Sequence, residues 1–380
     1  MNAMIFNEYK HTIIIPFHKN KKLLYYVLNL LQKTISPKVE VIVIANNYNK
    51  TEIDIQSPFS QVKIYQFQRD MFYPDAMNTG VSLACGDIIT MFDQDIFCYP
   101  GWYEPLFSKL ISSTNIGAVS PKLINPTNNR IIDFGIAYSP QNVLHPMRGL
   151  KRNHVCAQED RRVQSACSAV MMTYKSIYEE VGGMDITMPY ICCDCDYGIQ
   201  LKQKNYETWV VANSEVYHKG SSSLSNTKIS EYSHLRADSK AMFFAKDYSL
   251  LCFDIKDYLV QAVCKFKETH TVFPNYYFYN LCSLQDSKFF IQIVQKTFGI
   301  NFYDLFTINV GMRNPKQIQL YDYIPMSHLD ISEPFIYFVD TVVSLANNAF
   351  WWKNRKNPYD IIIDTNGNLL DREDIERMIV

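Results

Sequence analysis

Asp93 and Asp95 are the residues whose types and spacing point most directly to chemistry. They follow the run 86–92, whose apolar, β-favouring composition predicts a buried strand. Side chains two positions apart on an extended backbone point the same way, so both carboxylates face one space. Hard cations such as Mg²⁺ take one or two carboxylates together with oxygens of a substrate phosphate. The pair therefore indicates a metal-assisted nucleotide site, and solvated carboxylates at a strand end are the ordinary alternative.

Short apolar strands alternate with amphipathic helices around this pair. Strands are predicted at 12–15, 39–45, 62–67, 88–92 and 208–216, with further extended segments at 131–138 and 164–174. Helices are predicted at 19–33, 76–85, 174–181 and 194–205, with another opened by Pro100. This alternation predicts an α/β fold, a Rossmann-like layer with a mostly parallel central sheet and flanking helices. Pro16 is expected to end the first strand.

Polar or turn-forming residues follow three of the predicted strands. In parallel sheets, ligands bind outside the carboxyl ends of the strands. The residues that this rule gathers at one edge are Pro16, Phe17, His18, Asn46 and the Asp93-Gln94-Asp95 run. The sequence therefore predicts a single ligand-binding edge.

Bulk composition limits the classes of function. The chain has 380 residues, of which 47% are hydrophobic, enough for a sizeable core. Lys plus Arg number 37 and Asp plus Glu number 38, and this balance predicts no nucleic-acid partner. No apolar run reaches the length of a membrane span. Ten scattered cysteines and the lack of a secretory signal predict a cytoplasmic protein with reduced thiols.

The composition changes after a small, polar stretch at 219–226. A boundary is predicted near residue 230, separating a catalytic domain at 1–230 from a mostly helical region at 231–380. The second region is expected to select the acceptor, form a homodimer or dock on a membrane. Its aromatic and basic segment 347–356 fits peripheral association with an anionic membrane, and an ordinary packed helix is the alternative.

The order of these motifs resembles that of the family 2 glycosyltransferases, which have the GT-A fold. The resemblance covers residues 11–245 and depends on seven pieces in the right order. These are Ile13–His18, Val41–Asn47, Asn78–Asp87, Asp93–Asp95, Val181–Asp185, Cys193–Asp196 and the His218-x-Gly220-x-Ser222 ending.

The resemblance implies sugar transfer from a nucleotide-diphosphate donor, most simply a UDP-sugar, with Mn²⁺ or Mg²⁺ as cofactor. Asp95 would hold the metal, Asp93 would bind the metal and the ribose, and His218 would be a further ligand. A surface histidine beside a polar loop is the alternative for His218. The acceptor would be a glycan or a lipid-linked glycan in surface polysaccharide synthesis, at the inner face of the plasma membrane.

The resemblance also assigns the remaining site residues. Asp194 would be the general base of an inverting reaction, and a helix cap is the alternative. Asp75 and Asn78 would contact the nucleotide or sugar, and a helix cap is again the alternative for Asn78. The nucleoside pocket would be lined by Pro16, Phe17, His18 and Asn46.

Two positions depart from the family pattern. Asn46 stands in a stretch where the family has an Asp, so recognition of the base can differ, because an amide both donates and accepts hydrogen bonds. Cys193 replaces the usual Glu before Asp194, which is expected to reshape the acceptor side.

Other classes of protein remain open at this point. A retaining glycosyltransferase of the same fold and a non-catalytic nucleotide- or glycan-binding module share many of these residues. A nucleotidyltransferase also uses paired acids, but it needs a Gly-rich or basic phosphate loop, and residues 16–20 contain no glycine. Intact Asp93, Asp95, Asp194 and His218 favour the enzyme.

Overall fold

The computed structural model describes residues 10–46, 56–138, 143–148, 151–153, 157–220, 233–254, 277–280, 335–339, 360–364 and 369–370. The chain divides into two compact units. The first comprises Met1–Ala137 and Ala157–Cys252, and the second comprises Tyr138–Cys156 and Phe253–Val380. The described part contains no helix long and apolar enough to cross a membrane.

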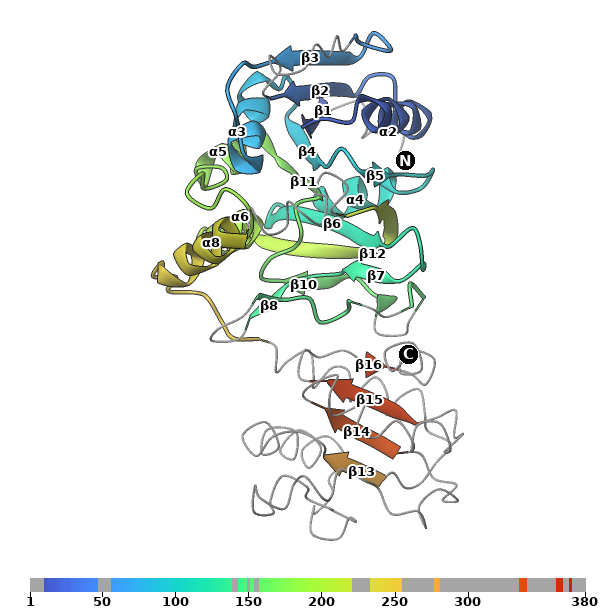
Figure 1. Ribbon diagram of the computed structural model, residues 1–380, viewed down its shortest axis with the longest axis vertical. Coiled ribbons are helices and arrows are strands. Elements are labelled where there is room, and N and C mark those ends of the chain that lie inside the picture. Colours follow the sequence, from blue (N-terminus) through green and yellow to red (C-terminus); the bar gives the residue numbers. More distant parts are fainter. Residues whose placement is uncertain are drawn as a thin grey trace. The chain divides into compact units, whose positions relative to one another are not determined.

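A ten-stranded sheet forms the centre of the first unit (Figure 1). Its main path runs in the order β10-β12-β6-β11-β4-β1-β2-β3, with β5 paired to β12 and β7 paired to β6. The strands are β1 (His11–Phe17), β2 (Glu40–Ala45), β3 (Val62–Gln66), β4 (Ile88–Phe92), β5 (Ile96–Phe97), β6 (Ile116–Ile124), β7 (Ile131–Asp133), β10 (Arg161–Val163), β11 (Val170–Tyr174) and β12 (Glu207–His218). A separate pair joins β8 (Ala137–Tyr138) and β9 (Val143–Leu144).

Most of this sheet is parallel, as the sequence predicts. β1 pairs in parallel with β2 and β4, and β2 pairs in parallel with β3. β11 runs antiparallel to both β4 and β6, so β4 and β6 point the same way, and β12 is parallel to β6. The carboxyl ends of β1, β2, β4, β6 and β12 therefore lie along one edge.

Helices cover the sheet where the sequence has amphipathic segments. They are α2 (Lys21–Thr34), α3 (Tyr73–Leu83), α4 (Tyr103–Leu110), α5 (Lys175–Glu180), α6 (Cys193–Gln203) and α8 (Ser233–Ala245). α3 packs on β1 and β2, and α4 packs on β6 and β12. Gly80 lets α3 approach β1 closely, since a Cβ atom there would lie 2.3 Å from a methyl group of Ile14.

One local prediction needs correction. Pro16 does not end the first strand, because β1 continues through Pro16 to Phe17. Pro16 pairs only with Ile44 of β2, beyond Ile14, where the pairing of β1 with β4 stops, so this end of β1 tolerates a missing N–H. A further strand, β6, is buried at every position and was not predicted from the sequence.

The second unit contains a four-stranded sheet in the order β13-β14-β15-β16. The strands are β13 (Tyr277–Asn280), β14 (Phe335–Val339), β15 (Ile361–Asp364) and β16 (Leu369–Leu370). The first three are parallel, and β15 and β16 are antiparallel. The prediction of a mostly helical 231–380 region falls largely outside the described residues, and the described part beyond Cys252 forms strands. α8 belongs to the first unit, whose last residue is Cys252, and the domain boundary near residue 230 stays a prediction.

Candidate functional site

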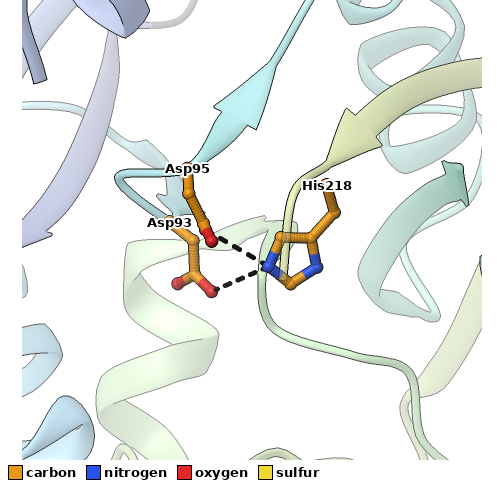
Figure 2. A group of neighbouring side chains, drawn as sticks. All are labelled: Asp93, Asp95 and His218. Atoms are coloured by element: carbon orange, nitrogen blue, oxygen red, sulfur yellow. Dashed lines mark ion pairs between the residues drawn. The ribbon is translucent and has the colours of Figure 1, made fainter. Parts of the chain in front are cut away.

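Asp93, Asp95 and His218 meet at the carboxyl edge of the sheet (Figure 2). The two carboxylates follow β4, and the imidazole ends β12. His218 Nε2 lies 3.2 Å from Asp95 Oδ1 and 3.8 Å from Asp93 Oδ2. One potential ligand atom from each residue fits within 4.8 Å of the others. The structure thus brings together the three side chains that the sequence analysis selected as metal ligands.

The local backbone explains this convergence. The amide of Asp93 donates to the carbonyl of Ala169 at 2.8 Å, which continues the pairing of β4 with β11. A tight turn then leads to β5, where Ile96 pairs with His218. The amide of Lys219 donates to the Asp95 carbonyl at 3.1 Å. The Asp-x-Asp turn is therefore held between β11 on one side and the end of β12 on the other.

The cluster contains two carboxylates and one imidazole, so negative charge exceeds positive charge. Burial raises the pKa of Asp93 to about 7; His218 opposes that rise, and the negative charges of Asp95 and Asp194 add to it. Burial works to lower the pKa of His218, but its hydrogen bond to Asp95 and the charges of Asp95, Asp93 and Asp133 together outweigh burial and raise the pKa. The site therefore favours an added positive charge.

Two buried atoms in the cluster lack hydrogen-bond partners among the described residues. They are Asp93 Oδ1 and His218 Nδ1. Buried polar atoms are normally satisfied, so such orphans call for an explanation, and an ion is one. Two carboxylates with one imidazole form a donor set that suits Mn²⁺, and carboxylates suit Mg²⁺. The residues present thus fit a divalent cation.

Gln94, the middle residue of the motif, has a role that the sequence analysis did not assign. Its Oε1 accepts from the amide of His18 at 2.9 Å, and its Nε2 donates to the His18 carbonyl at 3.3 Å. This reciprocal pair ties the turn after β4 to the end of β1. The signal in the sequence was a neutral amide between two acids at a buried strand end.

His18 and Asn46 lie together at the same edge. Asn46 Nδ2 donates to the carbonyl of Met71 at 2.7 Å, and Asn46 Oδ1 lies 3.3 Å from His18 Nδ1. Because a carbonyl only accepts, Met71 fixes the orientation of the Asn46 amide, and His18 must carry its hydrogen on Nδ1. Phe17 is different, since its side chain is buried in the hydrophobic core.

The other two predicted donor-binding residues are engaged within the protein. Asp75 accepts two hydrogen bonds from Arg69, at 2.7 and 3.0 Å. Asn78 donates to the Met184 carbonyl at 2.8 Å and accepts from the Tyr178 hydroxyl at 2.6 Å and the Met184 amide at 3.0 Å. These bonds join α3 to α5 and to the loop that follows α5. A contact of either residue with the donor stays a prediction.

Asp194 lies in the first turn of α6, half-buried. The N-cap position belongs to Cys192, so Asp194 is not the cap. Asp194 Oδ1 accepts from the Cys195 amide at 2.9 Å, and Oδ2 lies 3.4 Å from the Ser168 amide. The charge of Asp194 contributes to the raised pKa of Asp93, so the two carboxylates lie within electrostatic range of each other.

Tyr73 lies within electrostatic range of Asp93 and was not predicted from the sequence as a site residue. Its hydroxyl donates to the Ser168 carbonyl at 2.8 Å. Burial, with a contribution from the charge of Asp93, raises the pKa of this phenol well above its usual value. A tyrosine at the start of a helix carries no distinguishing sequence signal, because tyrosines are common in cores.

Comparison with known proteins matches one segment of the chain to a known family. The family described as glycosyl transferase family 2 matches residues 12–172. The chain carries a glycosyl transferase family 2 domain. The matched segment contains β1 to β4 and the Asp93-Gln94-Asp95 turn, whereas Asp194 and His218 lie beyond it. The family expected from the motif series is confirmed.

One curated relative is the O-antigen biosynthesis protein RfbC of Myxococcus xanthus. It is 23% identical over 225 residues, which cover 56% of this chain and 18% of the relative. The chain therefore spans less than a fifth of the length of that protein.

Solved structures with similarity to the family 2 domain also exist. GalNAc-T7 with UDP, GalNAc and Mn²⁺ is 17% identical with a TM-score of 0.47, covering 62% of this chain and 50% of that one. The mannosyltransferase PcManGT of Pyrobaculum calidifontis, in complex with GDP-Man and Mn²⁺, is 14% identical with a TM-score of 0.44, covering 70% and 76%. S. aureus TarS is 12% identical with a TM-score of 0.38, covering 68% and 49%.

Proposed function

We propose that this protein is a metal-dependent, inverting glycosyltransferase. It moves a sugar from a nucleotide-diphosphate donor to a hydroxyl of a glycan or a lipid-linked acceptor. The observation that carries the proposal is the Asp93–Asp95–His218 cluster at the carboxyl edge of the sheet, with Asp194 within electrostatic range of Asp93. The family 2 match over residues 12–172 supports the class of reaction.

Asp93, Asp95 and His218 would hold Mn²⁺ or Mg²⁺. When bound, the cation neutralises charge that develops on the leaving diphosphate. The side chains themselves place two negative groups and one imidazole at the point where β4 and β12 end. The unpartnered Oδ1 of Asp93 would accept a hydrogen bond from a ribose hydroxyl of the donor.

Asp194 would accept the proton of the attacking hydroxyl. A general base must lie within hydrogen-bond reach of the proton that it removes, and Asp194 is half-buried rather than sealed. The first turn of a helix favours a negative charge, which keeps a carboxylate ionised and able to act as a base. Direct attack assisted by one base inverts the anomeric centre.

The nucleoside would lie beside His18 and Asn46. Their mutual contact, together with the pairing of Gln94 to the His18 backbone, gives this edge a fixed arrangement of donors and acceptors. A UDP-sugar is the expected donor. The name of the M. xanthus relative, an O-antigen biosynthesis protein, supports a surface polysaccharide as the product. A lipid-linked acceptor would bring the protein to the cytoplasmic face of the plasma membrane, peripherally attached.

The test is a panel of UDP- and GDP-sugars offered to the purified protein with Mn²⁺. We expect Mn²⁺-dependent binding by calorimetry and turnover with at least one donor, and product of inverted anomeric configuration by NMR. Asp194→Asn should keep donor binding and lose about a hundredfold or more in turnover. Asp70→Asn, a change of an exposed carboxylate, is the matched control. Absence of both binding and turnover across the panel contradicts the proposal.

A further inference from the structure

Two motif carboxylates, Asp185 and Asp196, converge on one lysine away from the metal cluster. Lys246 Nζ lies 2.5 Å from Asp185 Oδ2 and 2.6 Å from Asp196 Oδ1. The hydroxyl of Tyr248 donates to the same oxygen of Asp196 at 2.6 Å. Asp196 is fully buried, so Lys246 supplies its neutralising charge.

The position of Asp196 makes this contact relevant to the proposed base. Asp194 and Asp196 are two residues apart on α6, and at 3.6 residues per turn their side chains leave the helix in nearly opposite directions. Asp194 faces Ser168, whereas Asp196 faces Lys246, just beyond the end of α8. α8 packs against α6 (Figure 1). The contacts of Asp196 and the position of Asp194 are therefore linked through the same helix turn.

Lys246 also spans the loop that enters α6. Asp185 stands at the start of this loop and Asp196 just after its end, so one ammonium group holds both ends. Between them, the amide of Tyr190 lies 3.4 Å from Ser239 Oγ of α8, and Arg236 of α8 lies 5.9 Å from the centre of the Tyr190 ring. Three contacts from α8 and its end thus define the path of residues 185–192.

The backbone before Asp194 needs such support. Cys192 has a φ of 67°, in the left-handed region that non-glycine residues avoid. Strained backbone persists only where the surrounding structure over-determines it. The amide of Asp196 donates to the Cys192 carbonyl at 2.8 Å, so the residue that Lys246 grips also closes the strained turn.

We propose that Lys246 is a positioning residue for Asp194: through Asp185 and Asp196 it fixes the entry loop and first turn of α6, and thereby the placement of the base. The role of Asp194 in this inference rests on the proposed function. The contacts of Lys246 with Asp185 and Asp196 do not depend on the proposed function, and their effect on residues 185–196 can be measured without turnover.

The experiment compares Lys246→Met, which removes the charge at similar length, with Lys246→Arg, which keeps it. Lys204→Met, an exposed lysine just beyond α6, is the matched control. Amide hydrogen exchange is followed by mass spectrometry in peptides covering 184–196 and in peptides covering β1 and β4. We expect Lys246→Met to speed exchange in 184–196 by about tenfold or more and to leave β1 and β4 unchanged.

The kinetic arm uses the nucleotide sugar that the panel identifies. Lys246→Met is expected to lower kcat by about tenfold or more while the donor KM changes less than about threefold, because the base is displaced and the donor edge is not. Lys246→Arg should recover most of kcat, and Lys204→Met should match the parent. Wild-type kcat in Lys246→Met overturns the proposal, as does faster exchange spread equally over β1 and β4.

A second variant covers failure of Lys246→Met to fold. Tyr248→Phe removes one hydrogen bond to Asp196 and keeps the ammonium, and it should show the same pattern at smaller size. Unchanged hydrogen exchange at 184–196 in a folded Tyr248→Phe protein would then contradict the proposed positioning role of Lys246. If the parent turns over no nucleotide sugar, the proposed function fails, and the exchange data still decide whether Lys246 holds this loop.

Discussion

Two pairs of aspartates in the first unit differ in the positive charge that lies beside them. Asp185 and Asp196 share the ammonium of Lys246 at 2.5 and 2.6 Å. Asp93 and Asp95 lie beside the imidazole of His218, at 3.8 and 3.2 Å. The first group contains a permanent cation that belongs to the chain. The second contains a weak base instead. Each group has one buried carboxylate oxygen without a hydrogen-bond partner among the described residues, Asp196 Oδ2 and Asp93 Oδ1, so the groups differ in the cation and not in these oxygens.

This difference separates a structural role from a binding role for the same residue type. A buried carboxylate needs a compensating charge, and the chain either supplies it or leaves the position open to a solute. Removing a carboxylate should therefore damage stability at the Lys246 group and activity at the His218 group.

The largest effect is expected at the His218 group. Asp95→Asn should reduce Mn²⁺-dependent turnover about a thousandfold, equivalent to about 4 kcal/mol at the transition state, because one cation ligand loses its charge. Without metal, the variant should melt close to the parent's temperature, because the repulsion lost between Asp95 and Asp93 offsets the attraction lost between Asp95 and His218. Turnover and thermal melts are the measurements. A variant with more than about a tenth of parental turnover would remove Asp95 from the metal site.

The opposite result is expected at the Lys246 group. Asp196→Asn leaves a partly buried ammonium with one carboxylate fewer and should lower the unfolding free energy by about 3 kcal/mol. Urea unfolding at neutral pH measures this, with an unchanged dependence on urea concentration as the check for two-state behaviour. A loss under about 0.5 kcal/mol would show that Lys246 does not stabilise the fold.

His11 is a third case, a buried histidine whose pKa is lowered, in contrast to the raised pKa of His218. His11 Nδ1 lies 2.5 Å from the Tyr103 hydroxyl, and burial lowers the pKa of His11 from 6.5 to about 4, with Asp87 opposing. Between these values the unfolded chain binds the proton and the folded chain does not, so stability falls as pH falls. We expect the parent to lose about 2 kcal/mol more than His11→Gln between pH 7 and pH 5, by urea unfolding. Parallel losses in both proteins would refute the assignment.

Some elements of this structure can be predicted from sequence patterns, and others cannot. The run 88–92 and the positions of Asp93, Asp95 and His218 were predictable, because a buried strand and spaced ligands leave local marks. The path of β6 was not, because Gly117, Pro121 and Lys122 interrupt its apolar pattern. That strand exists because its neighbours β11 and β12 enclose it, which is a tertiary cause.

Contacts between residues far apart in the sequence were the main feature that could not be predicted. Asp196 was recognisable as part of a motif, but its neutralisation by Lys246 depends on α8 packing on α6. Gln94 was visible between two acids, and its pairing with the His18 backbone depends on β1 lying beside β4. In each case the residue could be singled out from the sequence, but its partner depends on how the chain folds.

The order of the strands along the chain has a consequence for biosynthesis. β1 to β4 are made first and pair with one another, whereas β12, which ends in His218, inserts between β6 and β10 much later in the sequence. The complete set of three ligands therefore exists only after the non-local half of the sheet has formed. A cation that binds all three recognises the finished fold and not the nascent chain. By mass action, its concentration would then raise the stability of the completed protein and leave early folding intermediates unaffected.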